Sequence, residues 1–74
     1  MVIRGNRGVY FGNLDRMIFA CNARGEIDFY SAENPGYPVM IHRAESEKEA
    51  ADLIDTLLDA VWRKKANLFD FREP

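Results

Sequence analysis

The sequence is poor in the residues that cross-link small proteins through disulfides or metal ions. Cys21 is the only cysteine among 74 residues, so no disulfide can form within the chain. With a single histidine, His42, the chain also lacks the four Cys or His ligands of a usual structural zinc site. A chain of this length buries only about 60% of its unfolded surface and needs additional stabilisation. Self-association is the source of stability that remains.

Long hydrophobic runs are missing as well. No segment approaches the ~20 apolar residues that cross a bilayer, and residues 1–8 lack the apolar core of a signal peptide. A lone cysteine fits a reducing compartment, so we expect a cytoplasmic protein that is not inserted in a membrane. The hydrophobic fraction of 47% is typical of a folded chain. We predict one small domain over 1–74, strand-rich over 1–44, with a helix at about 46–65 and a tail over 66–74.

Charge of one sign is also scarce. The formal net charge is −2, with five cationic against four acidic side chains in residues 1–44 and five against eight in residues 45–74. All five cations of the first part are arginines. Neither balance is strong enough to predict binding to a polyanion.

The clearest pattern in the chain is an amphipathic helix. Ser46 is a good N-cap and Glu49, three residues later, completes a capping box. The main apolar face consists of Ala50, Leu53, Ile54, Leu57, Ala60 and Val61. Beside it, Ala51, Leu58 and Trp62 widen the apolar arc to roughly half the circumference, which exceeds what one packing contact needs. We expect the main face to pack on a sheet, this flank to meet a partner, and Asn67 to end the helix.

The segment Asn22-Ala23-Arg24-Gly25 predicts a hairpin turn with a G1 bulge. This turn sets a register in which Phe19 faces Phe29 and Ile18 faces Tyr30 across the two strands. The core face of the hairpin is then formed by Phe19, Cys21, Ile27 and Phe29.

Further strands are expected at Met1–Arg4, Val9–Phe11 and Pro38–Arg43, joined by loops over 5–8 and 12–16 and a turn over 34–36. The predicted fold class is α+β. It is an antiparallel four- to five-stranded meander sheet, followed by one long C-terminal amphipathic helix packed on one face and a short aromatic tail.

Two further groups of apolar residues have no assigned place in this fold. Leu68, Phe69 and Phe71 of the tail need burial, either as a short added strand, under the helix, or on a neighbouring subunit. If the helix covers one face of the sheet, the other presents an apolar patch of Ile18, Tyr30 and Met40. Either group is a candidate protein contact.

No residue set points to a reaction, a cofactor or a metal. Cys21 and His42 are the one pair able to act as nucleophile and base. Strand alternation, with Val39 and Ile41 facing the core, directs His42 to the opposite face from Cys21. The carboxylates of Asp52, Asp55 and Asp59 share one helical stripe, which is typical of a solvated face.

The leading hypothesis is therefore a non-enzymatic protein-interaction module that forms a homodimer and acts by binding another protein. Small sheet-plus-helix chains are common among bacterial and phage proteins, and a role as regulator or inhibitor is an analogy at the level of the fold. The predicted interface consists of Ala51, Leu58, Trp62, Leu68, Phe69, Phe71, Ile18, Tyr30 and Met40. The alternative is a single-stranded nucleic-acid binder that uses Arg4, Arg7, Arg16, Arg24 and Arg43.

Overall fold

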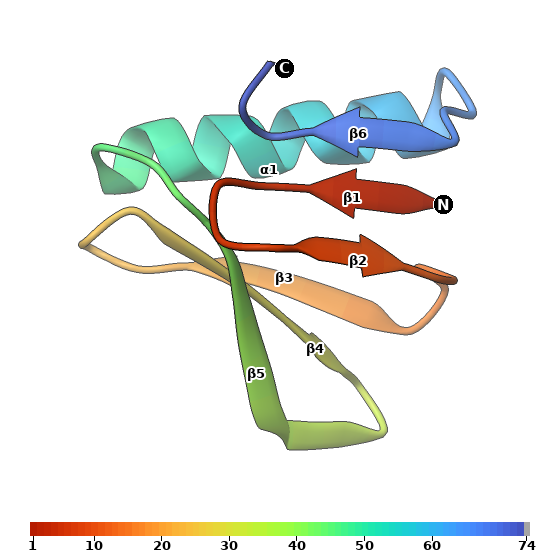
Figure 1. Cartoon of the computed structure of the whole chain (residues 1–74), viewed down its shortest axis with the longest axis horizontal. Coiled ribbons are helices and arrows are strands. Elements are labelled where there is room, and N and C mark those ends of the chain that lie inside the picture. Colours follow the sequence, from red (N-terminus) through yellow and green to blue (C-terminus); the bar gives the residue numbers. More distant parts are fainter. Residues whose placement is uncertain (74) are drawn as a thin grey trace.

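The protein combines two three-stranded sheets with one helix, as the computed structural model shows for residues 1–73 (Figure 1). The mixed α+β content expected from the sequence is confirmed. The elements in chain order are β1 (Val2–Arg4), β2 (Val9–Phe11), β3 (Met17–Cys21), β4 (Glu26–Ser31), β5 (Asn34–Arg43), α1 (Glu47–Trp62) and β6 (Leu68–Asp70). The strand order is β2-β1-β6 in the first sheet, here called sheet A, and β3-β4-β5 in sheet B.

The β3–β4 hairpin has the predicted register. Phe19 pairs with Phe29 and Ile18 with Tyr30. The Gly25 N–H donates to the Asn22 carbonyl at 2.9 Å, and Gly25 has a φ of +81°, the left-handed conformation that the turn requires. Local turn chemistry therefore specifies this hairpin.

The single four- to five-stranded meander is wrong. β1 and β2 do form the expected hairpin across residues 5–8, but they pair in sheet A and not with β3. The Gly12 N–H closes the β1–β2 ladder on the Met1 carbonyl, and Gly12 then has a φ of +152°. The Asn13 side chain accepts a hydrogen bond from the Asp15 N–H, which turns the chain toward the other sheet.

The tail takes the first of its three expected alternatives and adds a strand. β6 pairs with β1 in parallel, with Ile3 opposite Phe69. The Val2 N–H donates to the Asn67 carbonyl and the Phe71 N–H donates to the Arg4 carbonyl. Phe69 and Phe71 are consequently buried in the core of their own chain. Position 74 of the expected tail lies outside the described residues.

The turn expected over 34–36 lies earlier, at residues 32–33, because Ser31 pairs directly with Asn34. Pro35 and Pro38 cannot donate to a ladder, and the register is irregular until Phe29 pairs with Val39. A second irregularity at Ile41 lets His42 pair with Ile27 while Met40 pairs with Asp28. The expected alternation therefore fails. Ile41 and His42 are both buried, and Val39 is half exposed.

Helix α1 begins as expected and ends earlier. Ser46 Oγ accepts from the Glu49 N–H at 3.1 Å, and the Glu49 carboxylate accepts from the Glu45 N–H. The helix ends at Trp62, before the expected position 65. Lys65 adopts a φ of +54° and the Ala66 N–H bonds back to Ala60, so the chain has already reversed before Asn67.

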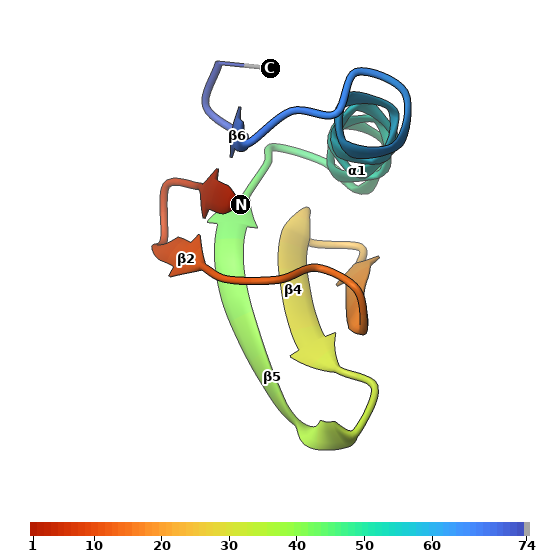
Figure 2. The same cartoon turned by 90° about the vertical axis from the view of Figure 1, so that its right-hand side faces the viewer.

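Sheet A, sheet B and α1 surround one shared core (Figure 2). Ile3, Phe69 and Phe71 come from the side of sheet A, while Ile27, Phe29 and Ile41 come from sheet B. The helix adds Ala50, Leu53 and Leu57, which belong to its predicted core face. The hairpin loop of sheet A joins the two sheets directly. The Asn6 side chain bonds both backbone groups of Arg43, and the Arg7 N–H donates to Ile41.

Candidate interaction surface

Among the residues of the predicted interface, those on the flank of α1 form the main exposed apolar surface on a single helix or strand. Leu58 is 43% exposed and Trp62 is 69% exposed, while Ala51 is half buried. Between the helix and β3 lies an apolar groove, with a cavity of about 50 Å³. Its lining consists of Leu14, Met17, Phe19, Leu57, Leu58, Val61 and Trp62. The groove therefore lacks charged side chains and has Trp62 as part of its wall.

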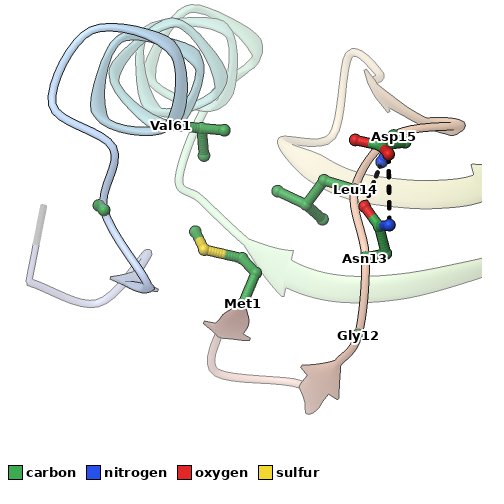
Figure 3. Close-up of a pocket in the computed structure, with 7 residues that line it drawn as sticks. Met1, Gly12, Asn13, Leu14, Asp15 and Val61 are labelled. Atoms are coloured by element: carbon green, nitrogen blue, oxygen red, sulfur yellow. Dashed lines mark hydrogen bonds between the residues drawn. The ribbon is translucent and has the colours of Figure 1, made fainter.

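A wider hollow adjoins the groove and shares Leu14 and Val61 with it. Figure 3 shows Met1, Leu14 and Val61 pointing toward one another at its apolar side. On the polar side, Asn13 and Asp15 bond to each other through their side chains and backbone. These polar groups hold the loop in shape, and the hollow continues the apolar character of the groove.

The remaining residues of the predicted interface lie on other faces. Leu68 is 62% exposed on the outer face of sheet A, whereas Phe69 and Phe71 are buried in the core. Ile18, Tyr30 and Met40 share the outer face of sheet B, because Ile18 pairs with Tyr30 and Met40 with Asp28. The structure therefore distributes the predicted set over three faces and the core, and the interface role of each residue stays a prediction.

The five arginines of the nucleic-acid hypothesis do not form one surface. Arg16 pairs with Glu33 beside the start of β3. Beyond the end of β3, the Arg24 Nε lies 3.9 Å from the Glu26 Oε1. Arg4, Arg7 and Arg43 gather around the β1–β2 hairpin loop. Two of the five are thus neutralised at opposite ends of a strand, and nucleic-acid binding stays a prediction without added support.

His42 lies in a polar cleft beside the tail. Its Nδ1 accepts a hydrogen bond from the Asn6 N–H at 3.1 Å, and its ring stacks on Phe71 with centroids 5.5 Å apart. Burial lowers the pKa of His42, against the opposing effect of Glu49 and Asp70. The neutral imidazole is therefore the form that this environment favours.

Asp70 forms a two-point ion pair with Arg72, which lines the same cleft. The Arg72 Nη2 lies 2.7 Å from Asp70 Oδ2, and Nε lies 2.9 Å from Oδ1. Hydrogen bonds from Arg72 lower the pKa of Asp70 to about 2. The pair fixes the end of β6 rather than leaving a reactive carboxylate.

Cys21 and His42 do not form a nucleophile–base pair in this structure. Both pair with Ile27, Cys21 from β3 and His42 from β5, so Ile27 lies between them. Two strand spacings separate them by roughly 9.5 Å, which is beyond hydrogen-bond reach. The bulge that buries His42 thus brings it to the face of Cys21 without bringing the two side chains together.

Two carboxylates of the acidic stripe of α1, Asp52 and Asp59, are paired with cations of the helix and of the segment that follows it. Lys48 Nζ lies 2.9 Å from Asp52, and Arg63 Nε lies 3.3 Å from Asp59. Within residues 1–73, no group of three or more metal-ligating side chains is found. The stripe therefore has the character of a solvated face.

Sequence reasoning missed two groove residues, Met17 and Leu14. Met17 follows the alternation that places Phe19 on the core face, so the strand pattern contains the signal for it. Leu14 has no such signal, because it lies in the loop over 12–16 whose path depends on the separation of the two sheets.

A scan against protein-family models and searches of curated proteins and of solved structures each returned no match. In the part of the chain that the structure describes, no helix has both the length and the apolar character needed to cross a membrane.

Proposed function

We propose that the protein is a non-enzymatic interaction module that forms a homodimer through the flank of α1 and binds another protein. The observation that carries the proposal is the exposure of Trp62, at 69%, on the wall of an apolar groove. Tryptophan is among the residues that contribute most to the binding energy of protein interfaces. Leu58 lies one helical turn away on the same flank and is also exposed.

Charge along α1 supports a second copy as the occupant. Glu47 and Glu49 lie in its first turn, and a basic segment over 63–65 follows its last turn. Two helices that pair antiparallel about a twofold axis place the basic end of each beside the acidic start of the other. Leu58 then lies near the axis, and Trp62 reaches the N-terminal half of the partner helix around Ala51.

Sedimentation of the purified protein over the micromolar range tests this proposal. We expect reversible dimerisation in the wild type, and Leu58→Lys is expected to weaken it by at least tenfold, because it places a charge in the apolar contact. Leu68→Lys is the matched control, since it changes an equally apolar, exposed residue on another face.

A wild-type protein that stays monomeric at high micromolar concentration contradicts the proposal. Equal weakening by Leu58→Lys and Leu68→Lys also contradicts it, because the interface then does not depend on the helix flank. Unfolding curves of both variants provide the check that each remains folded.

A further inference from the structure

β2 is an edge strand with unpaired backbone groups. The Gly5 N–H donates to the Gly8 carbonyl at 2.9 Å, and the Gly12 N–H donates to the Met1 carbonyl at 3.0 Å. These two bonds at the ends of the β1–β2 ladder determine which residue pairs within it are hydrogen-bonded. Bonded pairs alternate in an antiparallel ladder, so the N–H and C=O groups of Val9 and Phe11 point away from β1. Among residues 1–73, these four groups have no hydrogen-bond partner.

The other sheet edges of the molecule are protected, whereas the edge of β2 is open. The edge of β5 contains Pro35 and Pro38, and Asn6 bonds both backbone groups of Arg43 at its end. β3 packs beside α1. β6 ends in the Asp70–Arg72 ion pair. Natural proteins shield edges with prolines, charges or covering elements, and β2, with the sequence Val-Tyr-Phe, has none of these within the strand.

An apolar shelf lies beyond the open edge of β2. The β4–β5 hairpin projects past β2 in both views (Figures 1 and 2). Val39 pairs with Phe29, and the Phe29 ring contacts the Tyr10 ring with centroids 4.8 Å apart. Val39 therefore faces the side on which β2 lies, and it is 52% exposed. A strand added to β2 would cover it.

From these observations we propose that the edge of β2 binds an extended segment of another protein by strand addition. The ligand's backbone completes the hydrogen bonds of Val9 and Phe11, which is a recurrent mode of peptide recognition. Two of its side chains lie beside those of Val9 and Phe11, and the one between them points toward Val39. A second folded copy fits this place poorly, because its own projecting hairpin would enter the same space.

The charges near β2 define the chemistry of the segment further. Arg4 lies opposite Val9, and Arg7 lies in the hairpin loop at the same end of the strand. Neither arginine forms an ion pair within residues 1–73. The preferred ligand is therefore an extended run with β-branched or aromatic residues at alternate positions and an acidic residue at the Arg7 end.

The probe is a synthetic peptide of about seven residues that alternates valine and threonine and ends in one aspartate. We expect it to slow hydrogen exchange of the Val9 and Phe11 amides, measured by NMR, while the amides of α1 are unchanged. Methylating the alternate peptide nitrogens that face β2 is expected to weaken binding by about tenfold or more, because two backbone hydrogen bonds are lost. Methylating the other alternate set, which faces away, leaves binding unchanged.

Phe11→Pro removes the edge N–H and no ladder bond, so it is expected to abolish protection by the peptide. Phe11→Thr keeps the N–H and is the matched control for loss of the ring. Absence of protection at any peptide concentration overturns the proposal, as does equal weakening by both methylated peptides.

The proposal rests on the proposed function only in taking the partner to be a protein. Peptide binding is measured on the Leu58→Lys variant, in which the helix dimer is weakened. Failure of the helix dimer and failure of the β2 site are therefore separate results.

Discussion

The C-terminal tail and the flank of α1 contain similar apolar side chains but differ in exposure. Phe69 and Phe71 are 6% and 2% exposed, whereas Leu58 and Trp62 are 43% and 69% exposed. Phe69 and Phe71 are buried because β1 offers the tail backbone a row of hydrogen-bond partners, which holds these two side chains against the core. The helix flank has no such partner, since all helical backbone bonds are internal. Apolar content alone thus does not locate an interface, and backbone pairing separates the two cases.

The largest expected effect tests the tail side of this comparison. Phe71→Ala removes a ring buried between His42 and Phe69 and is expected to lower the free energy of unfolding by about 3–5 kcal/mol. Leu68→Ala, at an exposed position of the preceding strand β6, is expected to change it by less than about 0.5 kcal/mol. Urea denaturation measures both variants.

A Phe71→Ala protein that is unfolded without urea counts as a loss at least equal to the whole stability of the wild type. Similar unfolding midpoints for Phe71→Ala and Leu68→Ala would show that the tail is not part of the core, and the comparison would fail.

A smaller effect comes from acid. Because burial lowers the pKa of His42, the unfolded chain binds a proton more readily than the folded one. The stability linked to His42 is therefore present above the ordinary pKa of about 6.5 and is lost as the pH falls below it. Protonation of Nδ1 also removes the bond from Asn6, and the loss is on the order of 1 kcal/mol.

Unfolding free energies at several pH values between neutral and mildly acidic measure this effect. His42→Asn keeps an acceptor oxygen near the position of Nδ1 and cannot titrate, so its pH dependence is expected to be flatter than that of the wild type. An equal pH dependence of the unfolding free energy in the two proteins would show that His42 is not its source. The emission of Trp62 in the folded state is expected to stay constant, because acid affects the tail side and not the helix flank.

The sequence predicts what depends on local chemistry. Ser46 and Glu49 specify the start of α1, and the Asn22–Gly25 turn specifies the β3–β4 register, and both are confirmed. The division into two sheets was not predictable in this way. It depends on the parallel pairing of β6 with β1, whose residues lie more than 60 positions apart in the chain.

The candidate surface was predicted in part, for the same reason. Helical periodicity identifies Leu58 and Trp62 as a flank, and the structure leaves both exposed. The predicted set also includes Phe69, because an aromatic tail gives no local sign of its pairing partner, and the structure buries this residue. Strand alternation predicts the wrong face for His42, because the bulge at Ile41 shifts the alternation by one residue and nothing in the residues of β5 marks the position of that bulge.

The most direct test of the account follows the fluorescence of Trp62, the only tryptophan, as the protein is concentrated. An exposed indole at low concentration should become buried on the partner helix, so the emission is expected to shift to shorter wavelength through the micromolar range. Leu58→Lys should suppress the shift without changing the unfolding free energy of the monomer, measured at low concentration, by more than about 0.5 kcal/mol. An emission maximum that is independent of concentration, whether typical of exposed or of buried indole, would contradict the assignment of the α1 flank as the interface.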